Sequence, residues 1–209
     1  MTKPALELYH GSPSRSSIVL WMLEELGEPY SLHLLSLKDG DQLKPDYLAV
    51  NPMGKVPTLI DDGVAITEVA AICCHLADKY PKAGLAPAVT DPLRGPYLHW
   101  LFWAPSCLEP AIIDHVLSRP QAPRGMQGWI DYETTINILS AGVAKGPWIL
   151  GDRFTAADVV VGAGVNWGLM FGTIPKRPEL EAYAERLRAR PALQRSTAKD
   201  AEIGLQAIG

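Results

Sequence analysis

The chain has 209 residues, of which 47% are hydrophobic, so it is neither disordered nor fibrous and can form one large domain or two small ones. The 19 Lys and Arg residues against 23 Asp and Glu residues give a net charge of −4, which excludes the strongly basic surface that a nucleic-acid partner requires. The 3 cysteines, two of them the adjacent Cys73 and Cys74, cannot build a disulfide framework and predict a cytoplasmic location.

We expect neither a secretion signal nor a membrane-spanning segment. The N-terminal residues enter a strand-like pattern at once, with no charged start followed by a long apolar stretch. The most apolar window, residues 159–174, is interrupted by Gly162, Gly164 and Asn166 and falls short of the ~20 residues that a spanning helix needs. We interpret this window as a buried helix and expect no membrane partner.

The first 82 residues predict an α/β domain. Alternation of apolar and polar residues indicates strands, and Asp62-Gly63 is a two-residue hairpin signal. Gly27 and Pro81 stand where two helices should end. The predicted elements are strands over 6–9, 30–34, 56–61 and 64–66, and helices over 14–26 and 67–80. Their order is β-α-β, a loop, and then β-β-α.

Beyond this domain the strand patterns stop. Residues 83–91 resemble a linker, and residues 92–209 predict an all-helical domain. Apolar residues spaced by 3 and 4 form a helical stripe at Trp129, Tyr132, Ile136, Leu139 and Val143. Thr155 and Asp158 have the spacing of a capping box ahead of an apolar helix, and a further helix surrounds residues 180–187.

Residue spacing alone identifies no catalytic motif and no metal-ligand pattern, so no metal is expected. Several segments nevertheless resemble the cytosolic glutathione S-transferase family, of bacterial and fungal type with a serine-type loop. They are NPMGKVPTL at 51–59, TEVAAI at 67–72, WILGDRFTAAD at 148–158, and the stretch over 14–30. The resemblance implies a thioredoxin-like N-terminal domain that binds glutathione, an all-helical C-terminal domain with an apolar pocket for a second substrate, and a homodimer.

The resemblance also assigns glutathione contacts to a turn of the first domain. In family members the peptide bond that matches Val56-Pro57 is cis, and the backbone of the residue before the proline faces the cysteinyl part of glutathione. By the same resemblance Lys55 reaches the glycyl carboxylate; the other interpretation is a solvated lysine.

At the start of the helix over 67–80, the family has an acidic or amide residue followed by serine. Glu68 can meet the γ-glutamyl ammonium, and the N–H groups of the helix N-terminus can meet the carboxylate. The serine is replaced by Val69. Since a hydrogen bond to a charged group is worth ~1.5–3 kcal/mol, we expect weaker glutathione binding unless Thr67 or a nearby basic residue compensates.

Catalysis in this family requires a group near the end of the first strand that stabilises the glutathione thiolate, the nucleophile. Ser14 best matches the position of serine-type members at a helix N-terminus, where the dipole favours an anion. Tyr9 matches the position of tyrosine-type members, and Ser12 and Ser16 are further alternatives. Arg15 either adds positive charge beside the sulfur or is solvated. No cysteine lies in this loop, which disfavours mixed-disulfide chemistry.

The pocket for the second substrate is expected in the helical domain. Its candidate residues are Trp103, Ser106, Trp167 and Phe171, although aromatic residues at helical spacing also suit a protein core. The resemblance thus implies an enzyme that conjugates glutathione to an electrophilic, largely apolar small molecule, with peroxide reduction as a side activity. The alternative, supported by Val69, is a binding or regulatory module that keeps the fold with little turnover.

Overall fold

Two units make up the chain in a computed structural model that describes residues 5–206. The first unit joins Met1–Ala83 to Arg190–Gly209, and the second is Gly84–Ala189. The sequence placed all of residues 92–209 in one helical domain, whereas the last helix belongs by its contacts to the first unit. The segment 83–91 is also more than a linker, because Leu85 is 3% exposed and its carbonyl accepts the Ala156 N–H at 2.8 Å.

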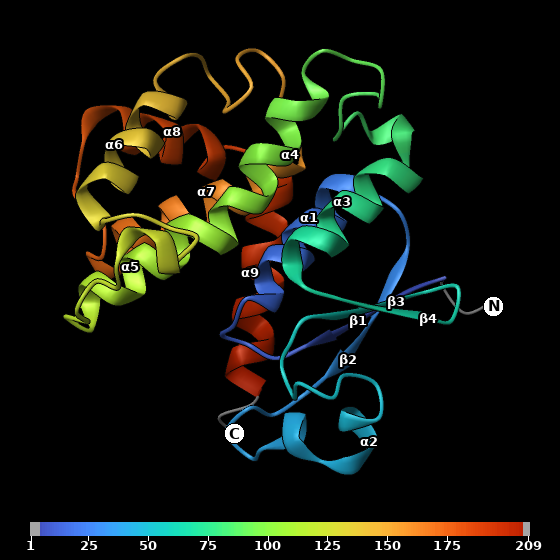
Figure 1. The fold of residues 1–209 in the computed structure, drawn as a ribbon. Coiled ribbons are helices and arrows are strands. Elements are labelled where there is room, and N and C mark those ends of the chain that lie inside the picture. The colour runs from blue at the N-terminus through green and yellow to red at the C-terminus, as the bar shows by residue number, and fades with distance from the viewer. Residues whose placement is uncertain (1–4, 207–209) are drawn as a thin grey trace. The chain divides into compact units, whose positions relative to one another are not determined.

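The first unit is built on a four-stranded mixed sheet in the order β2-β1-β3-β4 (Figure 1). The strands are β1 (Leu6–His10), β2 (Tyr30–Leu34), β3 (Thr58–Asp61) and β4 (Val64–Thr67). β1 runs parallel to β2 and antiparallel to β3, and β4 is antiparallel to β3. The sheet confirms the α/β prediction for this part of the chain and fits the thioredoxin-like domain that the resemblance implies.

The first unit has two helices that the sequence predicted, over 14–26 and 67–80, and two that it did not predict. They are α1 (Ser16–Leu26), the short α2 (Pro45–Leu48), α3 (Val69–Lys79) and α9 (Pro191–Gln206), with 3-10 turns at Asp41–Leu43 and Pro81–Ala83. The centre of α1 is buried on nearly all sides, because the helix contacts the sheet, α3 and α9. This explains why residues 18–23 read as a continuous apolar run rather than as a stripe.

Two turns of this unit require a positive φ, and the sequence supplies suitable residues for both. Gly27 ends α1 at φ 77°, and its N–H bonds to the Leu23 carbonyl at 3.0 Å. Asp62 and Gly63 have φ values of 49° and 82°, the pattern of a two-residue hairpin turn, and they connect β3 to β4 as predicted.

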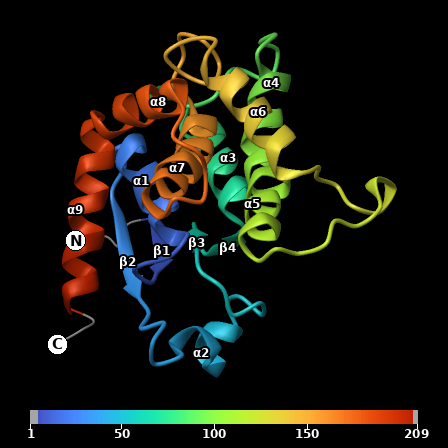
Figure 2. The same cartoon turned by 90° about the vertical axis from the view of Figure 1, so that its left-hand side faces the viewer.

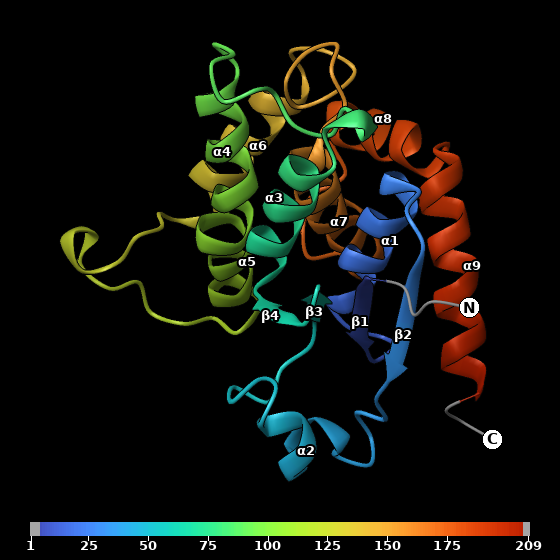
Figure 3. The same cartoon turned by 90° about the vertical axis from the view of Figure 1, so that its right-hand side faces the viewer.

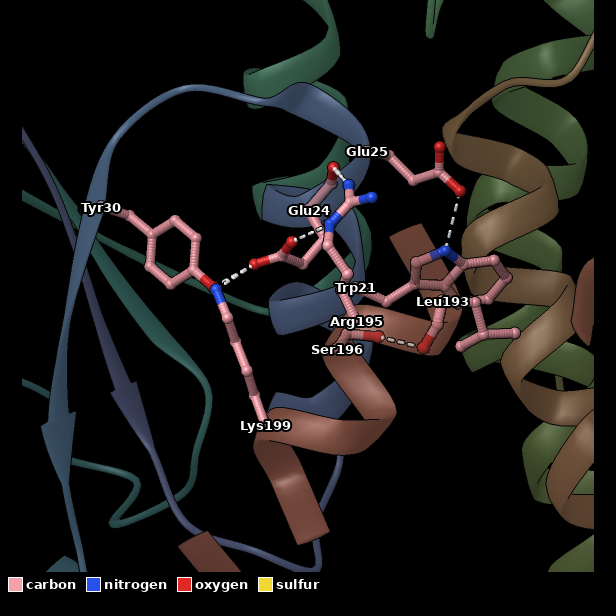
Figure 4. Close-up of polar contacts among 8 residues, drawn as sticks. All are labelled: Trp21, Glu24, Glu25, Tyr30, Leu193, Arg195, Ser196 and Lys199. Carbon is pink, nitrogen blue, oxygen red and sulfur yellow. Dashed lines mark hydrogen bonds and ion pairs between the residues drawn. The ribbon is translucent and has the colours of Figure 1, made fainter. Parts of the chain in front are cut away.

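Helix α9 lies alongside α1, as Figures 2 and 3 show. Two cations of α9 bind Glu24 of α1: Arg195 Nε lies 2.7 Å from one carboxylate oxygen, and Lys199 Nζ lies 2.5 Å from the other (Figure 4). Arg190, immediately before α9, forms two hydrogen bonds with the Glu25 carboxylate, at 2.6 and 2.7 Å. Charged contacts to two adjacent glutamates therefore tie α9 to the end of α1.

The second unit, as far as the structure describes it, is helical, and this confirms the predicted class. Its helices are α4 (Arg94–Trp103), α5 (Glu109–Val116), α6 (Tyr132–Val143), α7 (Ala156–Phe171) and α8 (Pro178–Arg188), with a π-helical turn at Ala104–Leu108 and a 3-10 turn at Arg124–Met126. The predicted stripe lies on α6, but Trp129 precedes the helix. The Asp131 carboxylate caps α6 by accepting the Thr134 N–H at 2.8 Å, so the helix begins at Tyr132.

The capping box predicted ahead of α7 is present. The Asp158 carboxylate accepts the Thr155 N–H at 2.9 Å, and it also accepts the Ile149 N–H and the Tyr183 hydroxyl. Asp158 is fully buried, so these donors satisfy a carboxylate that water cannot reach. Within residues 5–206, no helix combines the length and the apolar character that crossing a membrane would require.

Candidate functional site

Strand pairing brings three predicted segments to one end of the sheet. Tyr9, near the end of β1, is the antiparallel partner of Thr58 at the start of β3, and Thr58 pairs with Thr67 at the end of β4. The residues after β1, before β3 and after β4 therefore meet at the same end. These residues are the loop 12–16, the turn 55–57 and the pair 68–69.

Ser14 and Ser16 form the serine cluster of this end. Their hydroxyl oxygens lie 2.7 Å apart, and the Ser16 N–H donates to Ser14 Oγ at 3.1 Å. Ser16 Oγ also lies 2.8 Å from His10 Nδ1 and accepts the Gly11 N–H at 3.2 Å. Ser16 is fully buried whereas Ser14 is partly exposed, so Ser14 is the serine of this cluster that a small thiol can reach.

Ser12 and Arg15 lie on the same loop. The Ser12-Pro13 peptide bond is cis, and the Ser12 side chain hydrogen-bonds Asp200 of α9. Ser12 is thus directed toward α9. Arg15 is exposed and immediately precedes α1, whose first turn contains no acidic residue. The positive end of the α1 dipole and a guanidinium group therefore both favour an anion at this loop.

Tyr9 is separated from the serine cluster by the pleat of β1. Successive side chains of a strand point to opposite faces, so Tyr9 and His10 lie on different sides of the sheet. His10 faces Ser16. The Tyr9 ring instead stacks on His33 of β2, with centroids 4.6 Å apart, and lies 5.2 Å from the ring of Tyr47. Tyr9 therefore lies at the same end of the sheet as the serine cluster but on the face opposite to His10 and Ser16.

The turn before β3 is held by side chains of the preceding segment. The Val56-Pro57 peptide bond is cis, which is the geometry that the resemblance implies. The Lys55 carbonyl accepts the Tyr47 hydroxyl at 2.5 Å and the Asn51 amide at 2.8 Å. These bonds hold the backbone of the turn, while the Lys55 side chain is exposed.

Glu68 has an unusual backbone conformation at the start of α3. Its φ is 69°, a region that costs a non-glycine residue about 1–3 kcal/mol and is often found at functional sites. Its side chain is exposed and makes no capping hydrogen bond to α3. Val69 is the first residue of α3, whose first turn contains no acidic residue. The N–H groups of this turn thus face the same end of the sheet as Ser14.

The candidate pocket residues lie in the second unit. Trp103 ends α4 with its ring 5.2 Å from that of Trp100, and Ser106 lies in the following π-helical turn, where its hydroxyl donates to the Phe102 carbonyl at 2.7 Å. Trp167 and Phe171 lie on α7, which packs against α4, and Phe171 is 71% exposed. The packing places all of these residues on two neighbouring helices and in the turn after one of them.

Sequence reasoning missed His10, Asp200, Tyr47 and Asn51 as parts of this site. His10 shares the alternation of Leu6 and Leu8, a pattern that could have marked it as inward-facing. Asp200 carries no such signal, because it lies 190 residues from its partner. In the described part of the chain, no group of three or more His, Cys, Asp or Glu side chains is arranged to hold a metal ion.

Comparisons with known proteins cover most of the chain. Residues 14–79 match the family model described as "Glutathione S-transferase, N-terminal domain". "Glutathione S-transferase 3" of Schizosaccharomyces pombe is 32% identical over 169 residues, which are 72% of this chain and 69% of that protein. The disulfide-bond oxidoreductase YfcG of Escherichia coli is 26% identical over 95% of this chain and 97% of its own length. A glutathione transferase homologue from Sulfitobacter, solved with bound glutathione, superposes with a TM-score of 0.75 at 26% identity and covers 95% of this chain and 99% of its own.

Proposed function

The chain belongs to the glutathione S-transferase family, and we propose on this premise that it binds glutathione at the end of the sheet that carries Ser14. The observation that supports this most directly is the meeting of three segments there: the serine loop after β1, the turn at Val56-Pro57, and Glu68 with the N-terminus of α3. A relative of similar fold was solved with glutathione bound. Glutathione has two carboxylates and one ammonium group, which suit two helix N-termini and one exposed glutamate.

In this proposal Ser14 donates a hydrogen bond to the glutathione thiolate. Its support is the partial exposure of Ser14, its place just before α1, and the nearby positive charge of Arg15. A thiol with a pKa near ~8.5 is mostly protonated at neutral pH, so stabilisation of the thiolate accelerates any attack by sulfur. The backbone of Val56 and the side chain of Lys55 would hold the rest of the tripeptide.

We propose conjugation to an electrophilic, largely apolar small molecule as the reaction, with peroxide reduction as a side activity. Trp103, Ser106, Trp167 and Phe171 are the proposed contacts of the second substrate. Association into a homodimer through α3 and α4 and a cytoplasmic location belong to the same proposal. The support for them is family membership and, for the location, a cysteine content too low for a disulfide framework.

Val69 is the specific observation that favours a second function, a binding module with little turnover. Family members have a serine hydroxyl at this place for the γ-glutamyl carboxylate. Calorimetry with glutathione and turnover of a chloronitroaromatic substrate separate the two functions. Conjugation requires both binding and turnover, a module requires binding alone, and no detectable binding at millimolar glutathione would contradict both.

Ser14→Ala tests the role of the serine. Loss of a hydrogen bond to a charged group is worth ~1.5–3 kcal/mol, so the bound thiol should be harder to ionise and turnover should fall by about 10- to 150-fold. Tyr9→Phe is the matched control, because it also removes one hydroxyl but on the other face of β1, and it should leave both quantities unchanged. A thiol pKa that is unaltered in Ser14→Ala and raised in Tyr9→Phe would reverse the assignment.

A further inference from the structure

His10 is a fully buried histidine with both ring nitrogens hydrogen-bonded. Its Nδ1 lies 2.8 Å from Ser16 Oγ, and its Nε2 lies 2.9 Å from Asp200 Oδ1. With the 2.7 Å contact between Ser16 and Ser14, these bonds form one continuous chain, which we call the His10 relay: Asp200, His10, Ser16, Ser14. The relay begins on α9 and ends at the serine that is proposed to face the glutathione sulfur.

The position of Asp200 depends on the docking of α9. Arg195, which lies more than one helical turn before Asp200, and Lys199, which directly precedes it, both bind Glu24 of α1 (Figure 4). Ser17 of α1 donates a hydrogen bond to the second carboxylate oxygen of Asp200 at 2.7 Å. A carboxylate fixed by contacts on both sides can hold an imidazole in one orientation. The chain thus uses its last described helix to set the geometry of a histidine on its first strand.

The donors and acceptors of the relay have a definite order. Burial raises the pKa of Asp200, but hydrogen bonds from His10, Ser17 and Ser12 outweigh it and lower the pKa below its ordinary value, so the group is ionised at neutral pH. An ionised carboxylate only accepts, which places a hydrogen on His10 Nε2. In a neutral imidazole Nδ1 is then an acceptor, and it receives the Ser16 hydroxyl.

The same order continues to the end of the relay. Because the Ser16 hydrogen points to His10, Ser16 Oγ accepts the hydrogen of Ser14. Ser14 Oγ accepts the Ser16 N–H, and an sp³ oxygen has a second lone pair for the hydrogen of an incoming thiol. In this state every hydroxyl hydrogen points inward, and Ser14 is oriented to receive a proton rather than to donate one.

We propose that the His10 relay accepts the thiol proton of glutathione, with His10 as the proton acceptor and Asp200 as its positioning residue. This inference rests on the proposed function, because it assigns the base for the thiol that Ser14 is proposed to contact. Histidine is suited to the task, since it gains and loses a proton near neutral pH, and the carboxylate stabilises the imidazolium that forms.

The proton transfer balances without any further reactant. The S–H bond breaks and its proton goes to Ser14 Oγ, the Ser14 hydrogen moves to Ser16 Oγ, and the Ser16 hydrogen moves to His10 Nδ1. The products are a thiolate and an imidazolium paired with the Asp200 carboxylate. After the transfer the hydroxyl hydrogens of Ser16 and Ser14 point away from His10. The transfer that removes the thiol proton therefore also leaves Ser14 donating a hydrogen bond to the thiolate.

Several charged groups on β1, β2, α1 and α9 form ion pairs that do not include His10. On α9, Arg195 and Lys199 bind Glu24 of α1, and on β2 His33 lies 2.6 Å from Glu7 of β1. Within residues 5–206, the ion pairs described for His10 involve Asp200 alone. The imidazolium would therefore be stabilised mainly by this one carboxylate.

A count of protons tests the relay. Calorimetry of glutathione binding in buffers of different ionisation enthalpy counts released protons, and the ultraviolet absorbance of the thiolate reports ionisation. S-methylglutathione, which has no thiol proton, supplies the baseline. Starting from a neutral imidazole, the wild-type protein should form thiolate with almost no proton release, because His10 keeps the proton.

Two variants interrupt the relay at different points. His10→Gln should lower the fraction of bound glutathione in the thiolate form at least about tenfold. For every thiolate that still forms in this variant, one proton should be released to the buffer. Asp200→Asn keeps the shape but removes the carboxylate charge that pairs with the imidazolium, so the thiolate fraction should fall about tenfold or more. His33→Gln, which also removes a histidine paired with a carboxylate, should change neither quantity.

The outcomes distinguish the relay from the proposed function. No heat and no thiolate signal in the wild-type protein would overturn glutathione binding and the relay together. Normal thiolate formation with full proton release, equal in the wild type, His10→Gln and Asp200→Asn, would overturn the relay alone. Should His10→Gln lose the circular dichroism of the wild type, Asp200→Asn decides the question, because Asn can still accept the His10 hydrogen bond.

Discussion

The docking of α9 on Glu24 predicts a pH-dependent contribution to folding stability. Glu24 is 8% exposed. Burial raises the pKa of its carboxyl, but hydrogen bonds from Lys199, Tyr30 and Arg195 outweigh this effect and lower the pKa from 4.5 to about 2. Because the folded state holds the ionised form more strongly than the unfolded state does, ionisation of Glu24 stabilises the fold.

The magnitude follows from this difference in pKa. A fall from 4.5 to about 2 corresponds to about 3.5 kcal/mol of unfolding free energy, at about 1.4 kcal/mol per pKa unit. Arg195 and Lys199 are 53% and 47% exposed, so water screens both cations and we expect a little under half of this value, about 1.5 kcal/mol. The stabilisation is complete above the unfolded-state pKa of 4.5 and is lost as the pH falls toward about 2.

Glu24→Gln tests this reasoning, because it removes the titrating group and keeps the side chain's size. Urea unfolding of both proteins from about pH 7 down to about pH 3 gives the difference in unfolding free energy at each pH. The variant should be less stable by about 1.5 kcal/mol at neutral pH, and the deficit should shrink below about pH 4.5. Glu28→Gln, at an exposed position, is the control. A Glu24→Gln deficit that is the same at every pH would refute the argument.

Two further substitutions test the ligand site and the core. Val69→Ser restores the hydroxyl of the family pattern and should tighten glutathione binding by about tenfold, as measured by calorimetry. An unchanged affinity would show that a hydroxyl at this position does not contribute to glutathione binding. A Cβ on Gly142 would lie 2.5 Å from the Trp100 ring, so Gly142→Ala should lower the unfolding free energy by about 1–3 kcal/mol. Gly95→Ala, where a Cβ meets open space on α4, should not destabilise, and equal losses in both variants would contradict the packing argument.

Local patterns predicted most of the first unit. The strand over 30–34 has the bounds of β2, and the Asp62-Gly63 turn connects β3 to β4 because both residues tolerate positive φ. Helices α2, α4, α5 and α9 were not identified from the residues. In α9 charged side chains such as Arg195 and Lys199 are themselves the contacts with α1, so a search for an apolar stripe could not find them.

The sequence by itself determined the order of the strands, the two longer helices of the α/β part, the family, and the loop in which the serines lie, because periodicity, turn residues and motifs are local properties. Only the tertiary structure decided which hydroxyl joins which partner. The pleat of β1 turned Tyr9 away from Ser16 and turned His10 toward it, and the docking of α9 brought Asp200 to a histidine 190 residues away. Contacts of this kind depend on how separate elements pack, and no spacing within the chain encodes them.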